Sequence, residues 1–128
     1  MNLYLLRHGE TEFSRRDRFC GSIDAPLTAE GRRMAEQFAQ VYGDLPWRAI
    51  VTSTRARTID TAAPVAARAG LVPACDPRLD EIQYGAWQGM SKLEAQAHDA
   101  ERYARWRVDP TVGPPGGESP VAVCDRAR

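Results

Sequence analysis

Apolar residues gather in three short runs along the chain, and each run has the length and composition of a buried β-strand. The runs are residues 2–6, 47–52 and 71–75, in which aliphatic and aromatic side chains predominate. Short apolar runs bounded by polar or glycine-containing segments are typical of strands in the interior of a sheet. We therefore predict three strands at these positions.

Between the runs, apolar positions recur at helical spacing instead. In the stretch 29–42 they lie three or four residues apart, Thr28 has the side chain of an N-cap, and Gly43 suits the C′ position. The stretch 56–69 continues in the same way, and Pro64 inside it predicts a bend. Strands that alternate with helices predict an α/β fold, here a doubly wound, mostly parallel sheet flanked by helices.

The second half of the chain is richer in loops. Residues 91–107 are polar and alanine-rich, which predicts one or two short helices, and Trp106 is the side chain expected to anchor them to the core. Residues 109–120 hold four of the nine prolines and three of the ten glycines, so they are predicted to be a loop. Ser119 followed by Pro120 has the pattern of an N-cap with proline at N1, which predicts a helix from there.

Length and composition limit the class of protein. A chain of 128 residues predicts a single domain. The 17 basic and 17 acidic side chains give zero net charge, which argues against nucleic acid or a membrane surface as a partner. No run has the form of a membrane span or a signal peptide. The three cysteines include no Cys-x-x-Cys pair, so we expect free thiols, a cytoplasmic protein and no zinc site.

The first predicted strand leads directly into Arg7, His8 and Gly9. Ligands of open α/β sheets bind at the carboxyl ends of the strands, which is where these residues are expected. A guanidinium matches the oxygens of a phosphate group, and a neighbouring imidazole can act as a nucleophile or as an acid or base. Glycine lets a ligand approach the backbone closely. The three residues therefore indicate a phosphate site.

Five segments, in this order along the chain, resemble the motifs of the histidine phosphatase superfamily, also called the phosphoglycerate-mutase-like family. The first, Leu6-Arg7-His8-Gly9-Glu10-Thr11, matches the family signature residue for residue. The others are residues 21–31, 53–62, 79–89 and 116–119. One such motif alone would be weak, but five in order make chance agreement very improbable. The resemblance implies a phosphoglycerate-mutase-like fold.

The resemblance also implies roles for individual residues. His8 is the nucleophile, which forms a phosphohistidine. Arg7 and Arg57 bind the phosphoryl oxygens and stabilise their charge without a metal ion. Glu81 is the general acid that protonates the leaving oxygen, although a helix cap or a surface charge would also explain it. Arg55 stands where the family usually has an apolar residue, so Arg57 is the arginine of this motif.

Three further residues are candidates for binding phosphate or substrate. Gly21 and Ser22 offer backbone donors. Ser14 stands where the family often has asparagine, and its hydroxyl can still hydrogen-bond phosphate with a shorter reach. The arginines at positions 15, 16 and 18 suggest an anionic or multiply phosphorylated ligand, and a solvated basic loop explains them equally well.

One part of the family pattern is missing. The family has a second histidine in the catalytic pocket, after a later strand, whereas this chain has only His8 and His98. His98 follows no predicted strand, and we expect it to be an ordinary surface residue. We therefore expect the chain to be C-terminally incomplete, as the N-terminal portion of a longer protein, with a naturally shortened protein as the alternative. Apolar side chains of residues 3–6 would then be exposed or covered by a partner chain.

The function that the resemblance implies is hydrolysis of small phosphomonoesters through a phosphohistidine, with no cofactor and no metal. A phosphoglycerate mutase is the alternative within the family, but the segment from Gly89 to Pro114 is shorter than in family mutases. If 128 residues is the natural length, a non-catalytic phosphate-binding or interaction module is a further alternative. The expected partners are a small phosphomonoester and, through the incomplete sheet, a second copy of the chain.

Overall fold

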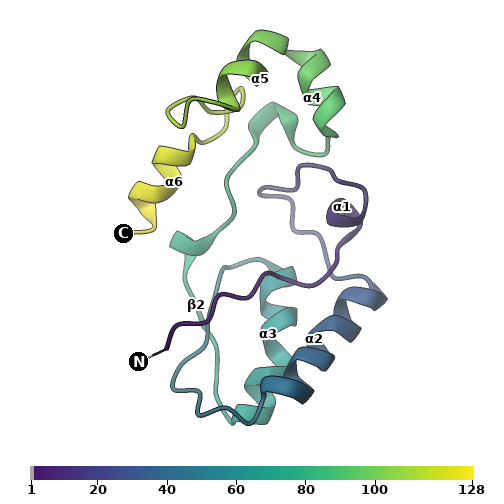
Figure 1. Cartoon of the computed structure of the whole chain (residues 1–128), viewed down its shortest axis with the longest axis vertical. Helices are drawn as coiled ribbons and strands as arrows, with labels where there is room; N and C mark the ends of the chain where they lie inside the picture. Colours follow the sequence, from purple (N-terminus) through teal and green to yellow (C-terminus); the bar gives the residue numbers. More distant parts are fainter. Residues whose placement is uncertain (1) are drawn as a thin grey trace.

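The computed structural model describes residues 2–128, and its helices form two groups (Figure 1). The elements are α1 (Glu12–Arg15), α2 (Ala29–Tyr42), β1 (Val51–Thr52), α3 (Ala56–Ala69), β2 (Ala74–Cys75), the 3-10 helices η1 (Pro77–Leu79) and η2 (Gly85–Trp87), α4 (Lys92–His98), α5 (Ala100–Trp106) and α6 (Pro120–Arg126). Helices α2 and α3 pack side by side at one end, α4 and α5 lie at the other, and α6 lies nearer the middle.

The two long helices have the bounds that the apolar spacing predicts. Thr28 caps α2 by accepting a hydrogen bond from the Gly31 N–H at 3.0 Å, and Gly70 ends α3 in the left-handed conformation, with φ of 66°. Gly43 differs from its prediction as a C′ residue, because its φ of −63° is right-handed. The chain there continues into a turn in which the Leu45 N–H bonds to the carbonyl of α2's last residue at 3.2 Å.

Small side chains allow these two helices to approach each other closely. On α2 the buried side chains are Ala35 and Ala39, and on α3 they include Ala62, Val65 and Ala66. Each set recurs every three or four residues and so lies on one face of its helix. The outward faces are mixed: charged side chains predominate, but Met34 and Val41 on α2 are 46% and 71% exposed.

The sheet is a parallel pair formed by β1 and β2, with α3 as the crossover. Val51 lies opposite Ala74, and Thr52 lies opposite Cys75. Both strands occupy only the carboxyl-terminal ends of the runs in which they were predicted. The β-α-β unit confirms the α/β class, and within residues 2–128 the sheet comprises these two strands alone.

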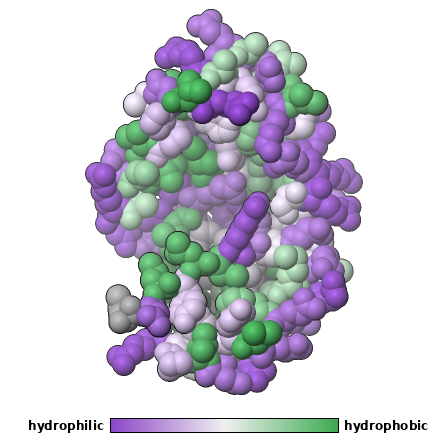
Figure 2. Space-filling view, in the orientation of Figure 1, coloured by the Kyte–Doolittle hydropathy of each residue, from purple (hydrophilic) through white to green (hydrophobic). Residues whose placement is uncertain are grey.

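The strand predicted for residues 2–6 does not form, so this prediction is wrong. Within residues 2–128 no segment exchanges backbone hydrogen bonds with this run, and a strand requires such a neighbour. Leu3 is 82% exposed and Leu5 is 91% exposed, while the Tyr4 ring packs edge-on against Trp47 at 4.9 Å. The expected exposure of residues 3–6 is confirmed, and Figure 2 shows apolar side chains gathered on the face near the N-terminus.

Aromatic side chains form the core of the second group of helices. Trp87 is fully buried, and its ring centroid lies 5.5 Å from those of both Trp106 and Tyr103. Phe19 joins the cluster from the first half of the chain, with its ring 6.2 Å from Trp87. Residues 91–107 form the two short helices α4 and α5, and the prediction that Trp106 anchors them is confirmed.

Further predictions about helices and surface residues also hold. Ser119 caps α6 by accepting a hydrogen bond from the Ala122 N–H at 3.2 Å, with Pro120 at N1. His98, the last residue of α4, is exposed. In the part of the chain that the structure describes, no helix combines the length and the apolar character needed to cross a bilayer.

Candidate active site

The loop that carries His8 contacts both long helices, α2 and α3, through Gly9. The Gly9 N–H donates a hydrogen bond to Thr61 Oγ1 at 2.9 Å, and that hydroxyl donates to the Arg57 carbonyl at 2.6 Å. A Cβ atom on Gly9 would overlap the Gly31 carbonyl, so the loop can lie this close to α2 only with glycine here. Since Arg57 and Thr61 are four residues apart on α3, the loop is fixed about one helical turn from Arg57.

The His8 ring is half-buried and is oriented by its neighbour. Nδ1 lies 2.7 Å from the Gly9 carbonyl oxygen. Because a carbonyl oxygen only accepts, Nδ1 carries the proton in this contact, and Nε2 of the neutral ring keeps its lone pair. Nε2 is therefore the His8 atom that is available for attack on phosphorus.

Arg57 is a charged side chain that is only 1% exposed. Its Nη1 donates to the Ile23 carbonyl at 2.9 Å, and its Nη2 donates to the Gly21 carbonyl at 3.0 Å and to Glu81 Oε2 at 2.8 Å. A buried cation is costly unless it is paired and hydrogen-bonded, and these contacts meet that need. Its Nε is buried and has no hydrogen-bond partner among residues 2–128.

Glu81 forms the exposed side of this ion pair, with a third of its side chain accessible to solvent. Oε2 faces Arg57, and among the described residues no hydrogen bond engages the other carboxylate oxygen. A ligand arriving from solvent could thus meet a free carboxyl oxygen beside a fixed guanidinium. The structure brings Arg57, Glu81 and the Gly21 carbonyl into direct contact.

Tyr84 borders the same group of residues. A Cβ atom on Gly21 would lie 3.1 Å from Cδ2 of the Tyr84 ring, so the ring packs directly on Gly21. Burial, reinforced by the negative charge of Glu81, raises the pKa of Tyr84 to about 12, against the opposing charge of Arg7. Arg7 itself is exposed. The phenol stays protonated at neutral pH and can donate a hydrogen bond.

Gly21 and Ser22 contribute differently from what the sequence suggests. Gly21 has a positive φ of 56° and directs its carbonyl, an acceptor, at Arg57. The N–H and the hydroxyl of Ser22 both donate to Gln88 Oε1, at 2.8 Å and 2.6 Å. The backbone donor of Ser22 is therefore occupied by Gln88. Their contact with phosphate or substrate stays a prediction.

Ser14 lies in a separate group of contacts. The Thr11 N–H donates to Ser14 Oγ at 2.9 Å, and the Ser14 N–H donates to Thr11 Oγ1 at 3.1 Å. This reciprocal capping box starts α1. The structure therefore gives Ser14 a local structural role, and its contact with phosphate stays a prediction.

The arginines at positions 15, 16 and 18 are engaged in ion pairs. Arg15 and Arg16 lie 2.8 Å and 3.4 Å from Glu12, and Arg18 lies 2.8 Å from Glu94. Ion pairs with carboxylates reduce the positive charge available to a ligand. The contacts favour the solvated basic loop over the multiply phosphorylated ligand.

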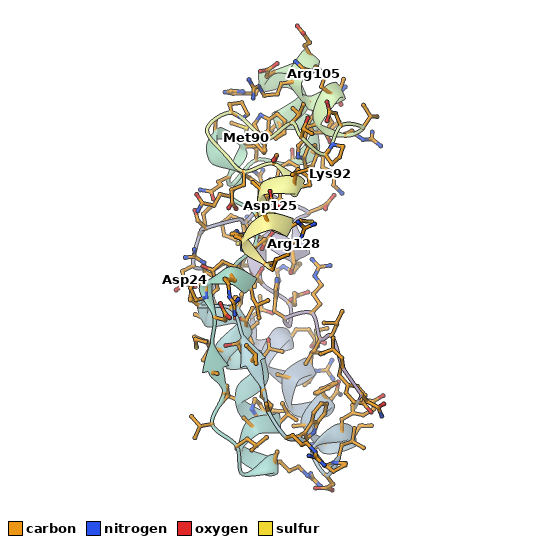
Figure 3. The ribbon with its side chains drawn as sticks, turned by 90° about the vertical axis from the view of Figure 1, so that its left-hand side faces the viewer. Asp24, Met90, Lys92, Arg105, Asp125 and Arg128 are labelled. Carbon is orange, nitrogen blue, oxygen red and sulfur yellow. The ribbon has the colours of Figure 1, made fainter. Side chains whose placement is uncertain are left out.

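A cavity of about 780 Å³ opens next to this loop, and residues 23–30 form part of its lining. Its lining includes Glu10, Asp24 and Glu30 but not His8, Arg57 or Glu81. An acidic lining repels phosphate, so the chemistry of the motifs, rather than the size of this cavity, locates the candidate site. Figure 3 shows Asp24 at mid-height, and its carboxylate accepts a hydrogen bond from the first N–H of α3 at 2.8 Å.

Sequence reasoning missed the supporting residues Thr61, Tyr84 and Gln88. All three lie inside recognised motifs, residues 53–62 and 79–89, so position within a motif was the available signal. Their partners are remote in sequence, 52 residues away for Thr61 and 66 for Gln88, and only the folded chain identifies them. Across residues 2–128, no cluster of three or more His, Cys, Asp or Glu side chains could hold a metal ion.

Comparison with curated proteins places the chain among phosphatases and mutases. Glucosyl-3-phosphoglycerate phosphatase of Mycobacterium tuberculosis (strain CDC 1551) is 39% identical over 126 residues, which cover 98% of this chain and 56% of that protein. A protein of Cronobacter sakazakii named probable phosphoglycerate mutase GpmB is 36% identical over 128 residues, covering 98% and 59%. The chain spans a little over half the length of these relatives.

Solved structures share the fold, and a family profile covers nearly the whole chain. The mycobacterial glucosyl-3-phosphoglycerate phosphatase in complex with VO3 has a TM-score of 0.87 and 38% identity, over 94% of this chain and 58% of that chain. YhfR of Bacillus stearothermophilus has a TM-score of 0.82 and 34% identity, over 94% and 60%. These likenesses confirm the predicted fold class. Since the profile also matches residues 3–128, which include all five motifs, the chain belongs to the histidine phosphatase superfamily (branch 1).

Proposed function

We propose that this protein hydrolyses phosphomonoesters of small metabolites through a phosphohistidine. The observation that carries the proposal is the ion pair of the buried Arg57 with Glu81, 2.8 Å between Nη2 and Oε2. A guanidinium can hold phosphoryl oxygens and an adjacent carboxyl can protonate a leaving oxygen, which are two requirements of phosphoryl transfer. His8 meets the third requirement, a nucleophile, on the loop that Thr61 fastens to the same helix.

In the proposed reaction, His8 Nε2 attacks phosphorus, and a P–N bond forms as the bond to the alcohol oxygen breaks. The negative charge of the bound phosphate favours the protonated form of Glu81, which gives its proton to that oxygen, so the alcohol leaves neutral. Arg7 and Arg57 stabilise the charge on the other phosphoryl oxygens. A water molecule then attacks phosphorus and gives a proton back to Glu81. A P–O bond forms as the P–N bond breaks, so inorganic phosphate is released and His8 is restored.

We propose a phosphorylated metabolite of modest size as the substrate. Relatives at 39% identity bear the name glucosyl-3-phosphoglycerate phosphatase, which makes that ester the first compound to test. Hydrolysis is favoured over mutase activity because a mutase must keep water out while the intermediate is rephosphorylated. Between Gly89 and Pro114 the chain has only the short helices α4 and α5 with which to cover the site.

A cytoplasmic location and a homodimer belong to the same proposal. Cys75 and Cys124 are exposed free thiols, which persist in a reducing compartment. Burial raises the pKa of the third thiol, Cys20, which keeps it protonated and unreactive at neutral pH. A second copy of the chain would cover the exposed apolar side chains of residues 3–6.

The test compares His8→Ala with His98→Ala in the intact natural protein. We expect His8→Ala to abolish turnover of every phosphomonoester, because the proposed mechanism takes the attacking nitrogen from His8. His98→Ala should leave turnover unchanged, since His98 is exposed at the end of α4. Near-parental turnover by His8→Ala would refute the nucleophile assignment.

The products separate hydrolysis from mutase activity. Incubation with 3-phosphoglycerate should yield inorganic phosphate and no 2-phosphoglycerate, and chelators should not change the rate. Accumulation of 2-phosphoglycerate would favour the mutase. Loss of activity on chelation, restored by magnesium, would contradict the proposed metal independence.

A further inference from the structure

A second arginine hydrogen-bonds to the backbone that carries Glu81. Arg126, on α6, donates from Nη1 to the Arg78 carbonyl at 2.7 Å and from Nη2 to the Asp80 carbonyl at 2.5 Å. Its Nη2 also lies 3.3 Å from the carbonyl of Glu81 itself. Figure 1 shows the end of α6 beside η1, the short helix that directly precedes Asp80.

Glu118 orients this arginine and also hydrogen-bonds to Gln83, two residues after Glu81. Arg126 Nε lies 2.9 Å from Glu118 Oε1, and Nη2 lies 3.1 Å from Oε2, so the pair is bidentate. The Gln83 N–H donates to Glu118 Oε2 at 3.0 Å, and the Glu118 N–H donates to the Gln83 carbonyl at 2.8 Å. The hydrogen bond from Arg126 lowers the pKa of Glu118, so the pair stays ionised at neutral pH.

The motif of residues 116–119 has the composition that this arrangement requires. A Cβ atom on Gly117 would overlap the Gln83 carbonyl, so the loop approaches the Glu81 segment this closely only with glycine there. Ser119 then caps α6, which places Arg126 two turns further along the helix. Figure 3 shows α6, which carries the labelled Asp125, over the middle of the molecule, where the two groups of helices meet.

We propose that Glu118 and Arg126 are positioning residues for Glu81. Arg57 fixes the carboxylate, and Arg126 fixes the carbonyls on both sides of Glu81's own N–H, so two arginines from different helices determine where the acid lies. The inference rests on the proposed function of Glu81 as general acid. A displacement of about 1 Å in a reacting group can cost a factor of about 100 in rate, so such a support affects catalysis directly.

The Glu118–Arg126 pair differs from the other bidentate pairs of the chain in its surroundings. Arg68 and Asp44 have the same geometry, with Nε and Nη2 at 2.8 Å and 2.7 Å from the two carboxylate oxygens. Their side chains are 43% and 76% exposed, whereas those of Arg126 and Glu118 are 24% and 23% exposed. Arg68 holds no part of the Glu81 segment, so it supplies a matched control.

The kinetic test compares Arg126→Gln with Arg68→Gln in the intact natural protein. For an alkyl phosphate, whose leaving oxygen needs a proton, we expect Arg126→Gln to lower kcat about 10-fold to 100-fold with little change in KM. For para-nitrophenyl phosphate, whose leaving group hardly needs the proton, the loss should be less than about 3-fold. Arg68→Gln should leave both rates unchanged. Equal losses for the two esters would overturn the proposal.

A second measurement needs no turnover and separates this proposal from the proposed function. In a crystal structure of Arg126→Gln, we expect the 2.8 Å contact between Arg57 and Glu81 to be broken, with faster hydrogen exchange at residues 80–83 than in the parent. Glu118→Gln should give the same change to a smaller extent, because its amide oxygen can still accept from Gln83. An unchanged contact and unchanged exchange would overturn the positioning role. A parent protein that turns over no phosphomonoester would instead refute the proposed function.

Discussion

At the scale of single residues, Arg57 has two roles. It is the candidate phosphate ligand, and it also satisfies the carbonyls of Gly21 and Ile23 and the Glu81 carboxylate. Arg57→Ala would remove the partner of all three acceptors, which is costly in itself for those that are buried. Lost activity in that variant would therefore combine lost phosphate binding with a displaced acid, and it would not measure either one alone.

The motifs indicated the central residues of the candidate site, but not the residues that contact and orient them. From sequence, the fixed spacing of the motif selects Arg57 over Arg55. The structure has Arg57 buried and Arg55 paired with Asp80 at 3.1 Å. The role of Gln88 was not predictable, because a glutamine has donors and acceptors for almost any partner. Only the fold brings it to Ser22.

We predict that Glu81→Gln slows hydrolysis most for esters with poor leaving groups. Glutamine keeps the size and one carbonyl-type acceptor for Arg57, but it has no proton to give. General acid catalysis is typically worth about 10²–10⁴ in rate, and an alkyl oxygen needs the proton far more than a nitrophenolate does. The measurement is kcat/KM for a series of esters with different leaving groups. Glu101→Gln, an exposed residue of α5, is the control. A uniform loss across the series would make Glu81 a structural residue.

We predict that Tyr84 makes the folded state less stable in alkali. Its pKa is about 12 in the folded protein and 10.0 ordinarily, so the protonated phenol is favoured on folding. That contribution to stability is complete below pH 10 and is lost as the pH rises from 10 through 12. Urea unfolding at pH 8 and pH 11 should therefore show a smaller alkaline loss for Tyr84→Phe than for the parent. The same loss in both proteins would contradict the prediction.

At the scale of elements, the predictions succeed where an element is determined by its own sequence. Helices α2 and α3 are long, have continuous apolar faces and carry local caps, so their bounds match the prediction. A strand depends on a neighbour that the local sequence does not specify. For this reason β1 and β2 are only partly formed, and the equally apolar residues 2–6 form no strand.

Gly31→Ala tests how closely the loop that carries His8 approaches α2. In an ordinary helix this substitution stabilises by up to about 1 kcal/mol. Here the added Cβ would overlap the Glu10 carbonyl, so the backbone must shift, and we expect a net destabilisation of about 1–3 kcal/mol. The destabilisation is measured as the change in the free energy of unfolding in urea. Gln37→Ala, on the exposed face of α2, is the control. A Gly31→Ala protein as stable as its parent would show that the approach is looser than described.

At the scale of the whole molecule, the two groups of helices are joined across the candidate site. Phe19 brings the first half of the chain into the aromatic cluster, and Arg57 on α3 reaches Glu81 in the second half. Arg126 then ties α6 to the same segment. We therefore propose that residues 1–128 belong to one domain, whose halves should unfold together.

The exposed apolar face of residues 3–6 has a consequence for the chain as a whole. Leu3 and Leu5 are more than four-fifths exposed and lie on a run without backbone partners among the described residues. Contiguous exposed apolar side chains on an unpaired segment favour association with another chain. We predict that the 128-residue chain, produced alone, associates as its concentration rises.

The double substitution Leu3→Ser with Leu5→Ser should suppress this association. The matched control is Leu93→Ser with Val108→Ser, which removes apolar side chains that are 79% and 83% exposed in the other group of helices. If residues 2–6 are the contact, sedimentation velocity over a concentration series should show association by the parent and by the control, and a monomer for the Leu3 and Leu5 variant. A parent that stays monomeric throughout would contradict the proposed homodimer. Equal suppression by both variants would mean that general surface hydrophobicity, rather than this segment, drives association.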